Sequence, residues 1–355
     1  MKKILILLII LPLNIKALGA SSYIAMDLNS NRIFYQNNIH QKRLIASTTK
    51  IMTAIVAIEN GNLNKIITVN DDILDSYGSA IYINVGEKLK LKDLLYGLML
   101  RSGNDAAITI SSSIAGNMTN FANLMNLKAQ SIGMKNTFFY NSHGLETKDG
   151  KGNVSTSYDM ALLTKYAMKN KIFREIFKTK IYKCKSNYKT YTWQNKNRLL
   201  YKLPYVNGGK TGFTTKARRT LVTTSSYKDL NVVIVTLNDP NDFKDHECLY
   251  KKIYEKYKLI TLIKKDDFKI KKDKYYNKHK LYINNDIKVP LSKNEINDIK
   301  IKYILNDNKY FKNNSKVGML KVFLKNNVIF EEPIYIRKLD KPISWWQKLI
   351  RWLKI

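Results

Sequence analysis

The sequence predicts an α/β (α+β) domain followed by a small all-β domain and a short amphipathic C-terminal helix. Three observations lead to this fold class. Strand-like alternating segments stand near residue 25 and again between residues 206 and 237, with helical periodicity between them. From about residue 266, short alternating segments and asparagine-rich turns replace the helical pattern. Residues 342–355 combine tryptophans with basic residues at helical spacing.

The composition is that of a large folded chain with a strong positive charge. Of its 355 residues, 45% are hydrophobic, which is enough for one large domain and a smaller one. The formal net charge is +33. The joint excess of Lys, Asn, Ile and Tyr favours coding bias as the larger cause, and attraction to anionic lipid or wall polymer is the alternative. No nucleic-acid-binding module is recognisable, so no nucleic-acid partner is expected.

The cysteines and histidines give no sign of a metal site or of another cofactor. Cys184 and Cys248 stand alone, and the four histidines are scattered. We expect both cysteines to be small buried hydrophobic residues, although an exported protein could join them in a disulfide. With one possible pair in so long a chain, the fold does not depend on a disulfide framework.

The N-terminus predicts export. A positive start at residues 1–3 precedes an apolar core at residues 4–13, and small residues follow. This is the pattern of a secretory signal peptide over residues 1–20, cleaved after Gly19 or Ala20. The apolar stretch is short for a membrane span, and an uncleaved anchor is the alternative. We therefore expect an exported protein, at the extracytoplasmic face of the cell membrane.

The first domain opens with a hairpin and a buried helix. Ser22–Asp27 and Arg32–Tyr35 alternate like strands, and Asn29-Ser30-Asn31 between them is typical of a turn. The helix that follows, from Ser47 to about Asn60, is apolar nearly all round, so it should lie in the middle of the domain.

Helices dominate the next part of the chain, from about residue 68 to residue 180. Leucines at a helical period predict a turn and helix over residues 86–98. A further helix is expected from about Asn120 to Gly133.

The pattern returns to strands after Pro204. Arg219–Ser225 and Leu230–Leu237 should pair around a turn, and a helix should follow from about Asp245 to Leu259. Pairing the first and last strands in one antiparallel sheet, with helices on its faces, closes a domain over residues 21–262.

The second domain is expected over residues 266–337, with short strands such as Lys280–Ile283 and Val322–Leu324. The amphipathic helix over residues 342–355 is too short to span a bilayer. Tryptophans beside basic residues suit a helix that lies in an anionic membrane interface, here the outer face of the cytoplasmic membrane. Docking of this helix on the protein itself is the alternative.

Ser47 and Lys50 stand at the start of the buried helix. Their spacing of three puts both side chains on one helix face, within reach of each other. A serine becomes a good nucleophile when a base takes its proton, and a lysine whose pKa is lowered by burial or by another cation can be that base. Unpaired N–H groups at the helix start could stabilise an oxyanion. In a lysine-rich chain, Ser-x-x-Lys gains its weight from later motifs.

Two further motifs follow in order. Ser102-Gly103-Asn104 is expected in a loop at a helix end, and Lys210-Thr211-Gly212 at a strand start. With the first motif, and in this order, they resemble the active-site set of serine penicillin-recognising enzymes. Over nearly its whole length, the sequence resembles the low-molecular-mass penicillin-binding proteins that act as D-alanyl-D-alanine carboxypeptidases. The flanking segments that carry the resemblance are Ser102-Gly103-Asn104-Asp105-Ala106, Asn136-Thr137, Asn141-Ser142-His143-Gly144-Leu145 and Gly209-Lys210-Thr211-Gly212-Phe213-Thr214.

The resemblance implies a serine β-lactamase/DD-peptidase-like sandwich with a helical lobe, and an active site between the two. It implies a peptidoglycan stem peptide ending in D-Ala-D-Ala as substrate, and β-lactam antibiotics as compounds that acylate the enzyme. Ser47 would attack, Lys50 would accept its proton, and Ser102 would pass a proton to the leaving amine. The residues expected to bind substrate are Asn104, Lys210, Thr211, Gly212 and Phe213.

The same resemblance assigns finer roles. The backbone N–H groups of Ser47 and Phe213 would form the oxyanion hole. Lys210 and Thr211 would receive the terminal carboxylate of the substrate. The charge of Lys210 would also help to lower the pKa of Lys50.

The sequence departs from the family pattern at one place, and other functions stay open. Ala217 is followed by Arg218-Arg219 where the family pattern has a glycine, which adds bulk and charge near the rim of the cleft. A β-lactamase would share the site, but Glu146, the nearest candidate for its glutamate, lacks the Glu-x-x-Leu-Asn pattern. A DD-endopeptidase or transpeptidase would use the same residues. A non-catalytic wall-binding protein is disfavoured by the intact motifs. His143 is expected to be structural.

Overall fold

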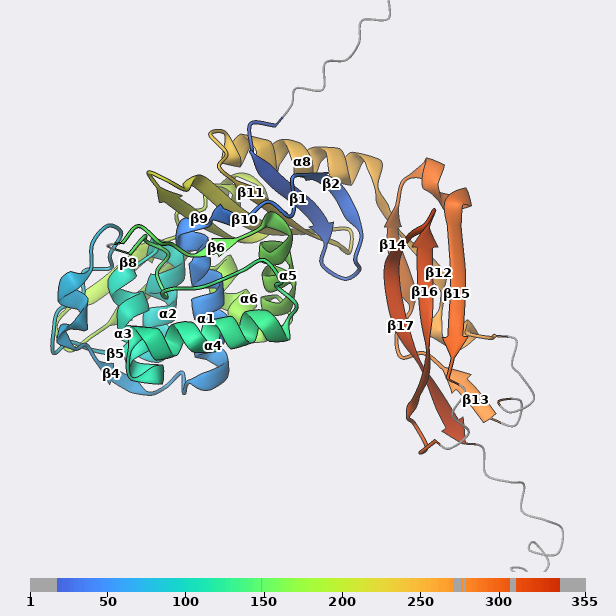
Figure 1. Ribbon diagram of the computed structural model, residues 1–355, viewed down its shortest axis with the longest axis horizontal. Coiled ribbons are helices and arrows are strands. Elements are labelled where there is room, and N and C mark those ends of the chain that lie inside the picture. Colours follow the sequence, from blue (N-terminus) through green and yellow to red (C-terminus); the bar gives the residue numbers. More distant parts are fainter. Residues whose placement is uncertain (1–17, 148, 271–275, 277–278, 307–310, 339–355) are drawn as a thin grey trace, which may run out of the picture.

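A computed structural model of the protein describes residues 18–147, 149–270, 276, 279–306 and 311–338. Two domains lie next to each other, and the long helix α8 (Asp242–Lys256) ends where the second begins (Figure 1). Residues 1–17 of the expected signal peptide and the expected amphipathic helix over residues 342–355 lie outside the described residues.

A five-stranded antiparallel sheet forms the centre of the first domain. Its order is β2-β1-β11-β10-β9, with β1 at Ser22–Asp27, β2 at Ile33–Asn37, β9 at Val206–Thr214, β10 at Arg218–Tyr227 and β11 at Leu230–Leu237. The predicted pairing of the first and last strands is confirmed, since Ser22 lies opposite Leu237 and Asp27 opposite Val232. The two predicted hairpins are also present.

Both faces of this sheet are covered by helices. On β11, Val233 and Val235 pack into the core of the helical lobe, whereas Val232 and Ile234 pack into the core beneath α8. Side chains alternate between the two faces of a strand, so β11 needs apolar residues at successive positions. This explains why its sequence reads as an almost continuous apolar run.

The helical lobe packs around α1, which is buried along most of its length. The expected helices over residues 86–98 and 120–133 are found as α2 with η3, and as α4. The helical elements are η1 (Ala46–Thr49), α1 (Lys50–Asn60), η2 (Asp71–Asp75), α2 (Leu91–Tyr96), η3 (Gly97–Arg101), α3 (Asn104–Ala115), α4 (Met118–Ser131), α5 (Ser157–Ala167), α6 (Lys171–Lys178) and α7 (Leu199–Lys202). The short strand pairs are β3 (Arg43–Leu44) with β6 (Val154–Ser155), β4 (Ile66–Thr68) with β5 (Lys88–Lys90), and β7 (Ile181–Lys185) with β8 (Thr190–Gln194).

Helix α3 and the β7–β8 hairpin are among the elements of this lobe that were not predicted individually. Helix α3 is rich in serine, threonine and asparagine, residues that favour turns when a sequence is considered locally. Its small side chains let it pack closely in the domain core, and tertiary packing stabilises it as a helix. The hairpin of β7 and β8 has polar residues on one face and the aromatic pair Tyr191 and Trp193 on the other.

Three boundaries differ from those expected. Helix α8 spans Asp242–Lys256, whereas a helix from about Asp245 to Leu259 was expected. Strand β9 begins at Val206, so Lys210-Thr211-Gly212 lies inside the strand and not at its start. The glycines before the motif weaken strand propensity and conceal this start. After α8, β12 (Lys258–Ile263) pairs with β14 (Ile287–Leu291) of the second domain, which places the end of the first domain earlier than residue 262.

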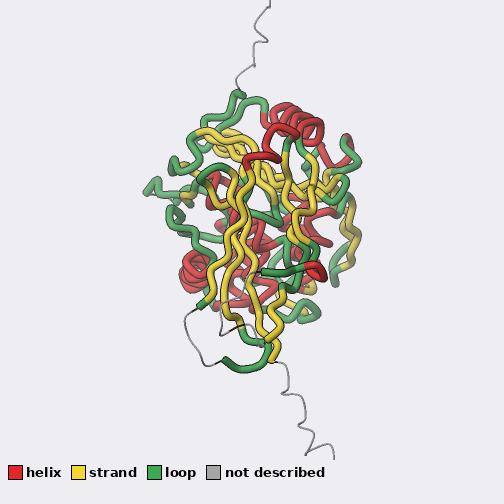
Figure 2. The backbone as a smooth tube through the Cα atoms, turned by 90° about the vertical axis from the view of Figure 1, so that its right-hand side faces the viewer, coloured by secondary structure: helices red, strands yellow, loops and turns green. Residues whose placement is uncertain are grey.

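The second domain is an all-β unit, as predicted. Figure 2 views the molecule from the side of this second domain and shows the long strands of the domain. One sheet has the order β13-β17-β16-β15, and β12 and β14 form a second pair. Its elements are η4 (Lys265–Asp267), β13 (His279–Tyr282), β14, η6 (Lys293–Asp298), β15 (Ile299–Leu305), β16 (Lys316–Leu324) and β17 (Asn327–Lys338). An ion pair between Arg32 and Glu295 joins it to the β1–β2 turn of the first domain.

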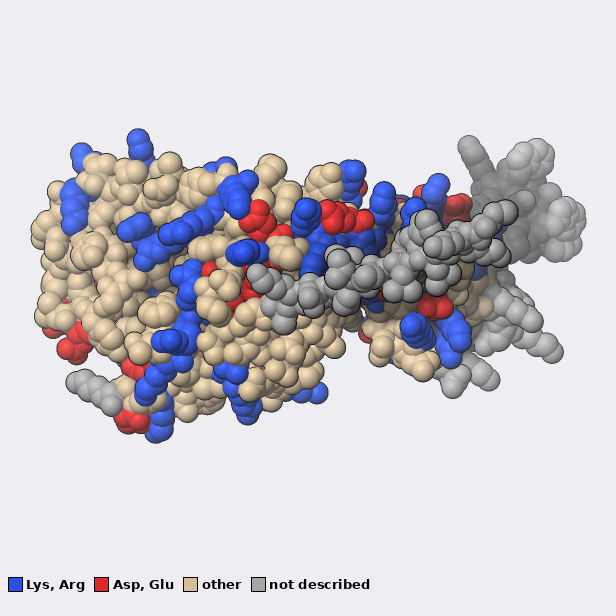
Figure 3. All heavy atoms as spheres, turned by 90° about the horizontal axis from the view of Figure 1, so that it is seen from above, with Lys and Arg blue, Asp and Glu red and all other residues tan. Residues whose placement is uncertain are grey.

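The surface of the protein is rich in positive charge, as the composition predicts, but the two cysteines differ from expectation. Lys and Arg side chains are spread over both domains on the face seen in Figure 3. In the part of the chain that the structure describes, no helix has the length and apolarity needed to cross a bilayer. Cys184 and Cys248 are free and partly exposed, so they are less buried than expected.

Candidate active site

The predicted nucleophile and base meet where η1 leads into α1. Lys50 is completely buried. Its Nζ lies 3.0 Å from Ser47 Oγ, 2.7 Å from Asn104 Oδ1 and 2.7 Å from the carbonyl oxygen of His143. A neutral amine that donates its two hydrogens to the amide and carbonyl oxygens keeps its lone pair for the serine hydroxyl. This geometry suits a base that takes the proton of Ser47.

The electrostatic environment favours that neutral form. The pKa of Lys50 is lowered to about 7, chiefly by burial and then by the charge of Lys196, while Asp105 acts in the opposite direction. Lys210 was expected to supply the repelling charge. Lys196 does so instead, because Lys210 is itself buried and its own pKa is lowered well below the usual range by burial and by the charges of Lys50 and Lys196.

The second motif sits at a break between two helical segments. The chain leaves η3, a wide π-helical turn, and Ser102 takes the left-handed conformation with φ +66°. Turns of this kind recur at functional sites. Asn104 then opens α3, and its side-chain Nδ2 donates to the carbonyl of Tyr77 at 2.6 Å. That bond fixes the amide so that its oxygen faces Lys50.

The third motif is joined to the other two by direct contacts. Lys210 Nζ donates to Ser102 Oγ at 3.0 Å and to the carbonyl of Thr211 at 2.6 Å. A Cβ added to Gly212 would lie 2.9 Å from the backbone nitrogen of Ser47 and 2.4 Å from Thr220 Oγ1. Only glycine lets β9 approach the serine so closely. The structure therefore brings all three motifs to one place.

The predicted site residues divide into a lining and a support. A cavity of about 530 Å³ is lined by Ser47, Ser102, Thr211, Gly212 and Phe213. Behind this lining, the buried residues are Lys50, Asn104 and Lys210. Ser102 lines the cavity although it is only 4% exposed, whereas Lys50, Asn104 and Lys210 can act on a ligand through the lining residues.

Sequence reasoning missed several residues of the same cavity, namely Arg101, Lys196, Arg198, Asp242 and Phe243. The signal that could have drawn attention to part of them is the polar run over residues 194–198 before the apolar pair Leu199-Leu200. No spacing rule connects this run to Ser47, because β7, β8 and α7 bring it to the cleft from far along the chain.

Two other candidates lie beside the site without facing the cavity. The Nδ1 of His143 accepts the N–H of Leu145 at 3.1 Å, and burial lowers the pKa of His143 to about 3, so its ring is neutral. Only its backbone carbonyl meets Lys50. The Oε1 of Glu146 accepts the hydroxyl of Thr214 at 2.7 Å, and Glu146 is not among the residues that line the cavity.

Comparison with known proteins identifies relatives for both domains. Residues 12–241 match a family described as D-alanyl-D-alanine carboxypeptidase, and residues 257–341 match the penicillin-binding protein 5 C-terminal domain. DacF of Bacillus subtilis is 30% identical over 222 residues, 61% of this chain and 56% of that protein. DacC of Escherichia coli is 32% identical over 267 residues, 70% of this chain and 65% of that protein. The chain thus spans less than two thirds of either relative.

Solved structures agree in fold over most of the chain. D-alanyl-D-alanine carboxypeptidase DacD from Francisella tularensis superposes with a TM-score of 0.69 at 25% identity, covering 95% of this chain and 96% of that one. Penicillin binding protein 5 from Haemophilus influenzae gives a TM-score of 0.75 at 23% identity, over 91% and 97% of the two chains.

Proposed function

The chain belongs to the D-alanyl-D-alanine carboxypeptidase family, and on this premise we propose that it removes the terminal D-Ala from peptidoglycan stem peptides through an acyl-enzyme on Ser47. The observation that carries the proposal is the contact of Ser47 Oγ with a buried Lys50 amine whose pKa lies near 7. A nucleophile beside a base that is half neutral at neutral pH is the requirement of acyl transfer.

Acylation follows from the positions of these groups. Ser47 Oγ attacks the carbonyl carbon of the penultimate D-Ala, and its proton passes to Lys50. The N–H groups of Ser47 and Phe213 stabilise the oxyanion. The C–N bond then breaks, and the leaving amine of the last D-Ala takes a proton through Ser102, which is held by Lys210.

Hydrolysis completes the cycle. A water molecule attacks the ester on Ser47, with Lys50 again as base, and the shortened stem peptide leaves. Glu146 does not line the cavity. This favours a slow release of the ester formed by a β-lactam antibiotic, and so a penicillin-sensitive enzyme over a β-lactamase. A DD-endopeptidase or transpeptidase would use the same steps with another leaving group or acceptor.

The location of this activity is part of the same proposal. The signal peptide over residues 1–20 directs export, and the amphipathic helix over residues 342–355 holds the enzyme at the outer face of the cytoplasmic membrane. At that face the enzyme meets its substrate, the stem peptides of peptidoglycan. Its positively charged surface is compatible with anionic lipid and wall polymer.

The test is D-Ala release from diacetyl-lysyl-D-Ala-D-Ala by the protein lacking the residues before Ala20, with Ser47→Ala as the matched control. The proposal expects release by the parent and none by the variant. Penicillin labelling at Ser47 without release would turn the function towards cross-link cleavage or transfer. The absence of both D-Ala release and penicillin labelling would reject the proposed enzymatic function.

A further inference from the structure

The motif lysine is poorly placed to receive the terminal carboxylate that the family resemblance assigns to it. Lys210 is 2% exposed, and its Nζ is occupied by Ser102 Oγ and by the carbonyl of Thr211. Lys210 is also absent from the residues that line the cavity. A carboxylate in the cleft therefore needs another cation that it can touch.

The cavity offers a choice of cations. Of the described residues that line it, one is acidic, Asp242, and the positively charged ones are Arg101, Lys196, Arg198 and Arg219. The Nζ of Lys196 is already engaged, since it donates to Ser79 Oγ at 3.1 Å. A cavity with such an excess of positive charge is complementary to an anionic group of the substrate.

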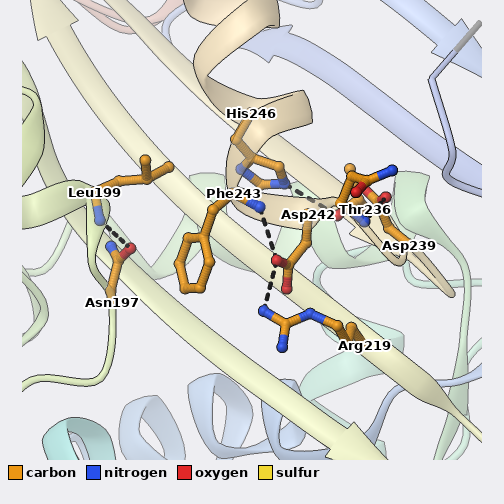
Figure 4. Close-up of polar contacts among 9 residues, drawn as sticks. Asn197, Leu199, Arg219, Thr236, Asp239, Asp242, Phe243 and His246 are labelled. Atoms are coloured by element: carbon orange, nitrogen blue, oxygen red, sulfur yellow. Dashed lines mark hydrogen bonds and ion pairs between the residues drawn. The ribbon is translucent and has the colours of Figure 1, made fainter.

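Arg219 is the cation that is both anchored and next to the third motif. It lies on β10 directly opposite Phe213 of β9, the residue after Gly212. Its Nη2 donates to Asp242 Oδ1 at 2.7 Å, and the guanidinium carbon lies 5.6 Å from the centre of the Phe243 ring. Figure 4 shows this arrangement, with Arg219 beneath Asp242 at the start of α8.

The anchor leaves most of the guanidinium available. The side chain of Asp242 is only 4% exposed and also accepts the backbone N–H of Phe243 at 2.7 Å, whereas the side chain of Arg219 is 44% exposed. A guanidinium has five N–H donors in a fixed fork, and a carboxylate can accept two of them. The guanidinium carbon of Arg198 lies 5.9 Å from the same ring and adds positive charge beside it.

We infer that Arg219, held by Asp242 and Phe243, receives the terminal carboxylate of the substrate together with Thr211, and thereby selects substrates with a free C-terminus. This inference rests on the proposed function and names the residue that sets its exopeptidase specificity. A preorganised arginine gives a carboxylate two charge-assisted hydrogen bonds, which an amide or a longer leaving group cannot make.

The experiment compares Arg219→Gln and Arg219→Lys with the matched control Arg218→Gln. Arg218 is the neighbouring arginine, is exposed and is not among the residues that line the cavity. Each variant is assayed for kcat and KM on diacetyl-lysyl-D-Ala-D-Ala and on the same peptide with a C-terminal amide. Thermal unfolding of each variant checks that the fold is kept.

The parent should prefer the free acid. In Arg219→Gln, kcat/KM for the free acid should fall about 10- to 100-fold, mainly through KM, while the amide is unaffected. For Arg219→Lys, kcat/KM for the free acid should lie between the values for the parent and for Arg219→Gln, because lysine keeps the positive charge but lacks the forked guanidinium. Arg218→Gln should stay within about twofold on both peptides. Equal losses on acid and amide, or an equal loss in Arg218→Gln, would overturn the inference; a parent inactive on both peptides would instead reject the proposed function.

Discussion

The buried environment of Lys50 predicts that acylation of Ser47 depends steeply on pH. The pKa of Lys50 is lowered from its ordinary value of 10.5 to about 7, so the amine is neutral and basic above pH 7 and protonated below it. For a pKa near 7, about nine tenths of the molecules hold a neutral amine at pH 8 and about one hundredth at pH 5. The rate of acylation should therefore fall about 90-fold between these pH values.

Lys196→Met is the perturbation that tests the cause. Lys196 is the second contribution that lowers the pKa of Lys50, after burial. Its removal should raise the pKa of Lys50 and move the inflection to higher pH, with the plateau at high pH retained. Each half-unit of upward shift lowers the rate at pH 6 about threefold.

The assay is the second-order rate of labelling by a fluorescent penicillin, followed from pH 5 to pH 9. Lys251→Met, an exposed lysine of α8, is the matched control and should keep the parent inflection. Circular dichroism at each pH checks that the protein stays folded. An inflection near the ordinary lysine value, or no shift in Lys196→Met, would refute this account of how Lys50 becomes a base.

Two further predictions concern glycine conformation and the second motif. Gly144→Ala should destabilise the protein by at least about 4 kcal/mol in urea unfolding, because φ is +89° and the new Cβ would lie 2.0 Å from the carbonyl oxygen of Ala46. Gly133→Ala, with φ +83° and nothing within 4 Å, should cost only about 1–2 kcal/mol, and equal losses in the two variants would contradict the packing explanation. Ser102→Ala should lower kcat for D-Ala release about 100-fold or more, as expected for loss of a proton-transfer group; an unchanged kcat would remove Ser102 from the proton path.

Local sequence patterns predicted most of the fold. The pairing of β1 with β11 was predictable because both strands alternate or run apolar and stand at the two ends of one domain. Helix α3 was missed because its serines and threonines favour turns locally, and packing in the core overrides that preference. Most residues of β12 were placed in the first domain, partly as the end of its last helix, because their partner strand, β14, lies more than twenty residues further on.

The site residues also divide into those that local sequence predicts and those that only the fold brings together. Ser47, Ser102 and Lys210 were found because short motifs keep their order and spacing. The influence of Lys196 on Lys50 and the anchoring of Arg219 by Asp242 depend on segments brought together by the fold, and nothing in the local sequence announces them. The sequence did mark Arg219 as a departure from the family pattern, without indicating what that arginine contacts.

The central claim is that Ser47 forms the acyl-enzyme. The most direct measurement is the mass of peptides from protein that has been incubated with benzylpenicillin and then quenched. The account predicts one stoichiometric adduct on the peptide that contains Ser47, and none in Ser47→Ala. An adduct on another residue, or an unmodified parent protein that is fully folded, would contradict it.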